Sequence, residues 1–292
     1  MLKVILETPV IAFILICLAA LVMVELLIRW LGIKSFPLFA RDDRCHYRMK
    51  GSQRGHFLNR YHWAYDERGM RTKDHVSTLA GAVILLGDSV VDGGIYVTQS
   101  ETLAERLQGA IGRTVYPIAC HGWSVENELA ALTSMPGWQN AEKLILVLNR
   151  GDFNYTNEGS SQWSFPSRLP LWLLPWLVCR QLYRRYPAWW PPERPAPTAE
   201  GIKRLRDQNL TRFKDVVEQF RGTVTILRFP LKGENPATET YFEALAAVAN
   251  SKVTLIDLSE SPLWTDDCYR DNIHPNSKGV DVLATYIEEK LF

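Results

Sequence analysis

The sequence has little that would mark a metal, redox or nucleotide site. It contains five cysteines in 292 residues and no C-x-x-C pair, so neither a zinc site nor a thioredoxin-like site is indicated. It also lacks a Gly-x-x-x-x-Gly-Lys loop and a His-Glu-x-x-His motif, which are typical of nucleotide-binding proteins and of zinc proteases. We therefore expect no metal and no cofactor. The few cysteines do not settle the redox compartment.

An excess of charge of one sign is missing as well. The chain has 33 Lys and Arg residues against 32 Asp and Glu residues, whereas a nucleic-acid-binding protein usually shows a basic face. A nucleic-acid partner is therefore not expected. The hydrophobic share of 47% is enough for one sizeable core with attachments.

A long apolar run is present at the amino terminus. Val10 to Val24 is unbroken apolar sequence, and Leu26 to Ile28 extends it past Glu25. About twenty helical residues cross a bilayer, so we expect one transmembrane helix from about Val10 to about Trp30, within an anchor over residues 1–34. No small-residue cleavage site follows, which favours an uncleaved anchor over a removed signal peptide.

The charges that flank this run favour one orientation. Lys3 is the only basic residue before it, whereas several follow it closely: Arg29, Lys34, Arg41, Arg44 and Arg48. The positive-inside rule by itself would place the large domain in the cytoplasm.

After residue 80 the pattern alternates between apolar strands and amphipathic helices. Residues 35–80 are predicted to be a connecting segment packed on the main domain, which covers 81–292. Strands are expected at 83–86, 114–120, 143–149, 223–229 and 252–258. Helices are expected at 100–112, with Ser100 as the N-cap candidate, and at 125–135, 199–220, 239–250 and 276–292. Fully apolar strands that alternate with helices predict an α/β fold with a parallel sheet covered on both faces.

A tract rich in tryptophan and proline, at about 160–198, interrupts this alternation. Tryptophan and arginine beside an apolar run are typical of a membrane interface, so the tract is interpreted as a lid or groove wall on the bilayer. The alternative is a proline-rich insertion packed on its own domain, and both interpretations stay open. "PPERPAP" at its end is expected to be a stiff connector.

Two short motifs at opposite ends of the domain suggest chemistry. The strand in "AVILLGDSVVDGG" runs into Gly-Asp-Ser, and "DNIHPNSKG" places Asp271 three residues before His274. Each motif alone is more often a turn. In a parallel sheet, however, Ser89 and His274 would follow strands that end at the same edge. An Asp that orients the His and a His that activates the Ser form a catalytic triad.

These motifs resemble those of the SGNH, or GDSL, hydrolases, over most of Tyr65 to Phe292. The resemblance implies a three-layer α/β/α sandwich with a flavodoxin-like sheet, Ser89 as nucleophile, His274 as base and Asp271 as the acid that orients it. "DERGMR" followed by the Gly-Asp-Ser strand looks like an envelope- and polysaccharide-associated branch with an amino-terminal anchor. That branch implies a single-pass protein of the bacterial inner membrane with an extracytoplasmic domain, contrary to the charge flanks.

The oxyanion-binding blocks match the family less well. The resemblance places Gly122 at the glycine of the second block. In the third block the family carries Gly-x-Asn-Asp, but this chain reads "LNRGDFN", with Gly151 at the asparagine position and Asp152 after it. Asn149, Asn154 or the charge of Arg150 could take the place of the missing asparagine as oxyanion donor. The loss of one oxyanion donor typically lowers the rate about a hundredfold or more.

These residues predict acyl transfer. The first hypothesis is a membrane-anchored serine ester hydrolase that removes O-acyl groups, in particular O-acetyl groups, from envelope or exported carbohydrate. The alternatives are an O-acetyltransferase that works with a membrane acyl-donor partner, a non-catalytic scaffold of a polysaccharide assembly, and an esterase for lipid.

Overall fold

The centre of the protein is a parallel sheet of five strands. The structure, a computed structural model, describes residues 2–74, 76–186, 189, 198–234 and 252–292. The strands lie in the order β6-β5-β7-β8-β9, which is the flavodoxin-like order, and all neighbouring pairs are parallel. Their bounds are β5 Val83–Gly87, β6 Val115–Ala119, β7 Lys143–Leu148, β8 Thr223–Arg228 and β9 Val253–Asp257. All five expected strands and the predicted fold class are confirmed.

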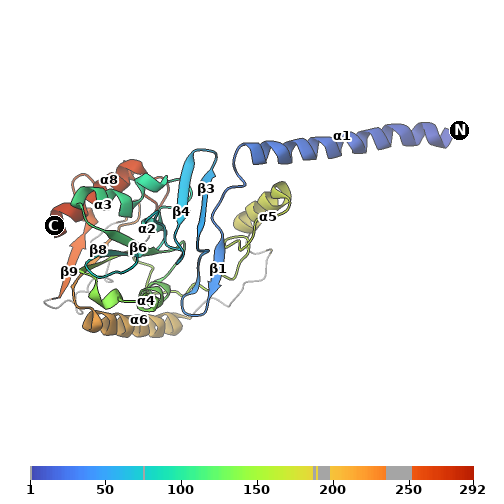
Figure 1. Cartoon of the computed structure of the whole chain (residues 1–292). Helices are drawn as coiled ribbons and strands as arrows, with labels where there is room; N and C mark the ends of the chain where they lie inside the picture. Colours follow the sequence, from blue (N-terminus) through green and yellow to red (C-terminus); the bar gives the residue numbers. More distant parts are fainter. Residues whose placement is uncertain (1, 75, 187–188, 190–197, 235–251) are drawn as a thin grey trace.

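Helices cover both faces of this sheet, as Figure 1 shows. The helices α3 (Leu103–Ile111) and α8 (Ser277–Leu291) pack on one face, and α4 (Val125–Ser134) and α6 (Ala199–Gln219) on the other. Successive strand residues point to opposite faces, so β5 alone supplies both cores: Val83 and Leu85 to the first, Ile84 and Leu86 to the second. This is why the strands are apolar without alternation.

The helix ends follow local chemistry. The Thr102 hydroxyl accepts the Glu105 N–H and begins α3, and Gly112 ends it with a φ of 64°. The expectation of Ser100 as the cap was wrong, because Ser100 lies in a short 3-10 turn, Gln99–Glu101, that precedes the helix. The helix expected at 239–250 and the connector "PPERPAP" lie outside the described residues.

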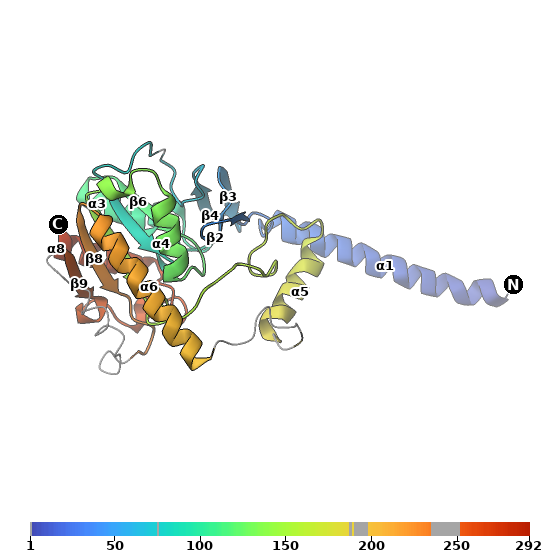
Figure 2. The same ribbon diagram turned by 90° about the horizontal axis from the view of Figure 1, so that it is seen from below.

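The apolar amino terminus forms one long helix, α1 (Leu2–Trp30). Within it, Pro9–Trp30 is long and apolar enough to cross a membrane, with a mean hydropathy of 3.0 and almost all of its surface exposed. Figures 1 and 2 show α1 projecting away from the domain.

Residues 35–80 build two antiparallel hairpins. They pair β1 (Phe39–Asp42) with β2 (His46–Met49), and β3 (Gln53–Phe57) with β4 (Tyr61–Tyr65). Tyr47 ties the first hairpin to the loop after β6, because its hydroxyl donates to the His121 carbonyl at 2.9 Å and its own carbonyl accepts from the Trp123 indole at 2.8 Å. The hairpins thus pack beside the carboxyl edge of the sheet.

A buried arginine between the hairpins and the sheet holds the loop that follows Ser89. Arg71 is 2% exposed. Its guanidinium donates to the carbonyls of Asp92, Gly94 and Val97 at 2.8, 2.5 and 2.5 Å. Three carbonyls of this loop therefore depend on a single side chain.

We expect Arg71→Met to lower the free energy of unfolding by roughly 3 kcal/mol, because it leaves three buried acceptors without their donors. Denaturant unfolding of the detergent-solubilised chain, followed by tryptophan fluorescence, measures this. Arg204→Met, on the exposed surface of α6, is the matched control. A loss for Arg71→Met no larger than that of the control would contradict the assignment.

Candidate active site

Ser89 lies where β5 turns sharply into the short helix α2 (Ser89–Asp92). The turn requires glycine at position 87, since a Cβ there would lie 2.6 Å from the Val91 side chain and 3.2 Å from the Val147 carbonyl. Asp88 caps α2 by accepting the Val90 N–H at 2.8 Å. As a result Ser89 stands at the carboxyl edge of the sheet, 8% exposed.

Ser89, His274 and Asp271 form a continuous hydrogen-bonded relay. His274 Nε2 lies 2.9 Å from Ser89 Oγ, and His274 Nδ1 lies 2.9 Å from Asp271 Oδ2 and 3.0 Å from Asp271 Oδ1. The Asp271 carboxylate also accepts the backbone N–H groups of Ile273 and His274. This local turn is what presents the His274 ring to Asp271 on one side and to Ser89 on the other.

The environment keeps Asp271 ionised. Partial burial acts to raise its pKa, but the hydrogen bonds from the backbone of His274 and Ile273 and from the His274 ring together lower it to about 2. An ionised Asp271 can hold the His274 N–H on Nδ1, which leaves Nε2 to accept the Ser89 proton.

Gly122 follows β6, next to the end of β5. Its backbone has a φ of 71°, which favours glycine. Asn157 Nδ2 donates to the Gly122 carbonyl at 2.7 Å, and the Tyr155 hydroxyl donates to the next carbonyl, that of Trp123, at 2.9 Å. Side chains from the loop after β7 therefore fix the peptide groups around Gly122.

The third block lies at the end of β7, on the other side of β5. Asn149, 9% exposed, accepts the Gly151 N–H on Oδ1 at 3.0 Å, so the Gly151 N–H is already used within the loop. Asp152 accepts the Asn149 N–H at 2.7 Å. Arg150 is exposed, and its backbone carbonyl accepts a hydrogen bond from the Asn154 side-chain amide at 3.5 Å. Asn149 is thus the most enclosed of the candidate oxyanion donors, and the sequence argument left it beside Arg150, Gly151 and Asn154.

Beneath this edge lie three buried carboxyl groups: Asp88, Glu128 and Asp152. Burial raises the pKa of each, and the proximity of the other carboxyl groups adds to the effect for Glu128 and Asp152. No group of three or more acidic, histidine or cysteine side chains that could hold a metal ion is found among the described residues.

The sequence argument missed a second histidine and aspartate pair beside the triad. The ring of His121 lies 6.2 Å from that of His274, centroid to centroid, and its Nδ1 lies 3.4 Å from Asp92 Oδ2. Asp92 is fully buried and accepts the Tyr65 hydroxyl at 3.0 Å. The positions of these residues were a usable signal: His121 precedes Gly122, and Asp92 lies three residues after Ser89.

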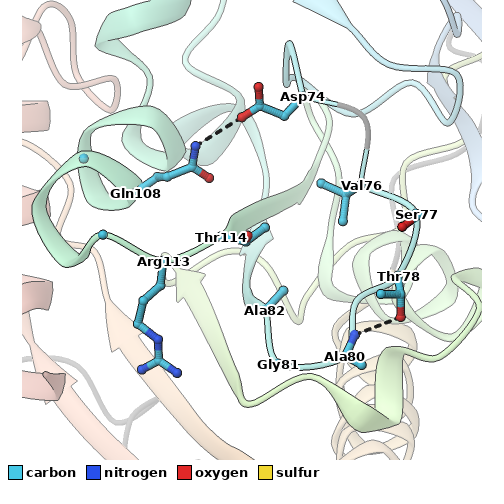
Figure 3. A pocket seen from close by; sticks show the side chains of 12 residues that line it. Asp74, Val76, Ser77, Thr78, Ala80, Gly81, Ala82, Gln108, Arg113 and Thr114 are labelled. Atoms are coloured by element: carbon cyan, nitrogen blue, oxygen red, sulfur yellow. Dashed lines mark hydrogen bonds between the residues drawn. The ribbon is translucent and has the colours of Figure 1, made fainter.

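Two cavities lie at different distances from this site. The one of about 810 Å³ in Figure 3 lies at the opposite edge of the sheet, where Ala82 and Thr114 precede β5 and β6, and Gln108 donates to Asp74 at its rim. A smaller cavity of about 70 Å³ lies next to the triad, lined by His121, Asp92 and, from α5 (Leu173–Arg185), Arg180. The smaller cavity thus shares His121 and Asp92 with the pair beside the triad, whereas the larger one is lined by residues at the far edge of the sheet.

We expect the acid limb of any Ser89-dependent activity to come from a group other than Asp271, because Asp271 stays ionised down to about pH 2. A profile of kcat/KM from pH 4 to pH 9 tests this.

The lowered pKa of Asp271 also contributes to the stability of the fold. This contribution is fully present at pH values above 3.8, the ordinary pKa of the group, and is lost as the pH falls towards 2.

Asp271→Asn should lower kcat on the order of a hundredfold or more, because His274 would then hold its proton on the wrong nitrogen. An unchanged kcat would contradict the relay.

Comparison with known proteins gives structural likeness without sequence relatives. No protein-family model and no curated protein matches the chain. Among solved structures, the chain is similar to the acetyl xylan esterase Est2A from Butyrivibrio proteoclasticus, with 12% identity, a TM-score of 0.41, and coverage of 76% of this chain and 67% of that one. It is also similar to a GDSL-like lipase from Bacteroides thetaiotaomicron, with 9% identity, a TM-score of 0.41, and coverage of 72% and 87%.

A third similar structure is a carbohydrate esterase family 2 enzyme from Corynascus, with 14% identity, a TM-score of 0.41, and coverage of 76% and 70%. These values describe a likeness of fold, so support for an activity comes from the site itself. The solved structures that this chain resembles include ones described as an SGNH hydrolase, a GDSL-like lipase and a carbohydrate esterase.

Proposed function

We propose that this chain is a membrane-anchored serine ester hydrolase that removes O-acyl groups, in particular O-acetyl groups, from envelope or exported carbohydrate. The observation that carries the proposal is the relay from Asp271 through His274 to Ser89. Each link in it is 2.9–3.0 Å long, within the range required for proton transfer from a nucleophile to its base.

In this mechanism Ser89 Oγ bonds to the ester carbonyl carbon while its proton passes to His274 Nε2. The carbon–oxygen bond to the sugar then breaks, and His274 returns the proton to the leaving hydroxyl. Water attacks the acyl-Ser89 ester and loses a proton to His274. The acyl–oxygen bond then breaks, Ser89 regains its proton and the carboxylic acid leaves. Asp271 holds the imidazolium in both halves without taking its proton.

The oxyanion would be bound where the ends of β6 and β7 flank Ser89. We assign the donors to the backbone N–H groups of Ser89 and Gly122 and to the side chain of Asn149. Supporting this assignment, Gly122 is held by Asn157, and Gly151 uses its N–H on Asn149. In this assignment the side-chain amide of Asn149 replaces the asparagine of the family's third block.

The substrate class and the location rest on other features. The Pro9–Trp30 helix is suited to anchor the domain at a membrane. Acylated envelope carbohydrate is accessible from the extracytoplasmic side of a bacterial inner membrane, which is the side implied by the anchored branch.

We expect Ser89→Ala to lower turnover of p-nitrophenyl acetate and of an acetylated oligosaccharide by about a thousandfold or more, because the nucleophile is lost. Acetate release by the detergent-solubilised full chain measures this. Ser100→Ala, which removes an exposed hydroxyl, is the control and should retain full activity. Equal rates for Ser89→Ala and wild type would refute the proposal.

The same assay separates hydrolysis from transfer. An unacetylated acceptor sugar is added, and both free acetate and newly acetylated sugar are measured. Serine-dependent acetate release supports the hydrolase. Serine-dependent acetylation of the sugar with little acetate release would replace it with the O-acetyltransferase, which uses the same acyl-enzyme.

We expect Asn149→Ala to lower kcat by about a hundredfold with little change in KM, because an oxyanion donor acts mainly in the transition state. Asn154→Ala, in the same loop, is the matched control and should stay within a few-fold of wild type. If Asn154→Ala shows the larger loss, the donor has been assigned to the wrong asparagine.

A further inference from the structure

The tryptophan-rich tract forms a helix, α5 (Leu173–Arg185), that is tied to the end of α1. Glu25, a lone acid in the apolar run, is the tie: its carboxylate accepts the N–H groups of Leu173 and Leu174 at 2.9 and 2.8 Å. Arg29 completes the joint by donating to Glu25 at 2.7 Å and to the Leu171 carbonyl at 2.5 Å. A carboxylate at the first turn of a helix is favourable, and Glu25 is 6% exposed.

The position of Glu25 along α1 determines how deep the start of α5 would lie in a bilayer that α1 crosses. Glu25 lies five residues before Trp30, about 7.5 Å along the axis at 1.5 Å per residue. The candidate span of 22 residues is about 33 Å long, close to the roughly 30 Å hydrocarbon core. If α1 crosses a bilayer, the first turn of α5 therefore lies at the boundary between headgroups and acyl chains.

The direction of α5 fits this boundary. Figures 1 and 2 show α5 on the side of the domain from which α1 projects, and in both views it turns away from the direction of α1. A helix that starts at the boundary and turns away from the span runs along the membrane surface, as interfacial helices do.

The outer side of this tract is apolar. Leu171 is 85% exposed, and Leu169, Trp172 and Val178 are about half exposed. The inner side is packed, since Leu173 is buried and the Trp176 ring stacks on Phe36 at 5.1 Å. Exposed apolar patches of this kind mark contact with a membrane or a protein.

Charge favours the membrane as the occupant. Arg168 precedes the helix, and Arg184 and Arg185 lie in its last turn, all three exposed. Arginines beside an interfacial apolar face attract anionic lipid headgroups. The apolar face also lies next to the exposed apolar surface of α1, so one lipid layer can cover both.

From these contacts we propose that Leu169–Arg185 is an interfacial segment, with Leu171, Trp172 and Val178 in the bilayer that α1 crosses. The inference rests on the membrane anchoring in the proposed function and adds a second contact with the same bilayer. Its consequence concerns the position of the site: Arg180 of α5 lines the 70 Å³ cavity together with His121, whose ring lies 6.2 Å from that of His274, so the interfacial segment would hold the surroundings of the triad close to the bilayer.

The test uses the purified full chain in nanodiscs of phosphatidylcholine and phosphatidylglycerol that carry bromine near the top of the acyl chains, which quenches nearby tryptophans. Trp172→Phe probes the interfacial segment, and Trp30→Phe probes the end of the span. Trp138→Phe, in a position that is 3% exposed in the domain core, is the control. The measured quantity is the fluorescence that the brominated lipid quenches, to which any of the ten tryptophans near the acyl chains contributes. We expect Trp172→Phe and Trp30→Phe each to lower it by about the contribution of one tryptophan, and Trp138→Phe to leave it unchanged.

The outcomes separate the two ideas. If Trp30→Phe lowers the quenched signal but Trp172→Phe does not, the anchor stands and the interfacial segment is refuted; its apolar face would then belong to a protein partner, which these nanodiscs lack. If neither variant lowers the signal, α1 does not cross the bilayer, and the anchoring and the inference both fail. Esterase activity is measured separately, so neither result depends on it.

Discussion

The hydrogen bond between His274 and Ser89 joins side chains 185 positions apart, and the candidate site depends on it. It exists because the sheet is parallel: β5 and β9 run in the same direction, so the segments that follow them emerge at one edge. At that edge the glycine at position 87 allows a turn tight enough to lift Ser89 out of the strand. The Asp271 turn then brings the His274 ring across to it. If the strands lost this common direction, the same residues would be ordinary turn residues.

The two hairpins and the loop after β7 pack against the same edge of the sheet and fix its loops. Tyr47, Asn157 and Tyr155 each bond a backbone carbonyl between His121 and Trp123, so the peptide groups around Gly122 are held from two sides. Arg71 does the same for the loop after α2. In the proposed mechanism the oxyanion donors must not have to reorganise, and these contacts would hold the peptide groups around Gly122 in place.

The joint between α1 and α5 connects the amino-terminal helix to the rest of the protein. A charged Glu25 in an apolar helix would be costly by itself, and the N–H groups at the start of α5 together with Arg29 offset that cost. Because Trp176 of α5 stacks on Phe36, just beyond α1, and Arg180 lines the cavity that also includes His121, the end of α1, α5 and the cavity wall pack together. This arrangement explains why an acidic residue, Glu25, stands in the otherwise apolar run.

The sequence by itself predicted the strands of the sheet and the residues that the candidate site brings together. Short apolar runs such as Val83–Gly87, bounded by turn residues and alternating with amphipathic helices, favour buried parallel strands, and Ser89 with the Asp271 and His274 pair are the residue types that nucleophilic catalysis requires. The Ser100 cap was mispredicted because a short turn before α3 depends on its neighbours rather than on its own propensity. Only the tertiary structure decided which residues meet: the His121 and Asp92 pair, the bond of the Gly151 N–H to Asn149, and the partners of Glu25. The contacts of His121 with Asp92 and of Glu25 with Leu173 join segments far apart in the chain, and local sequence does not fix the distance between their side chains.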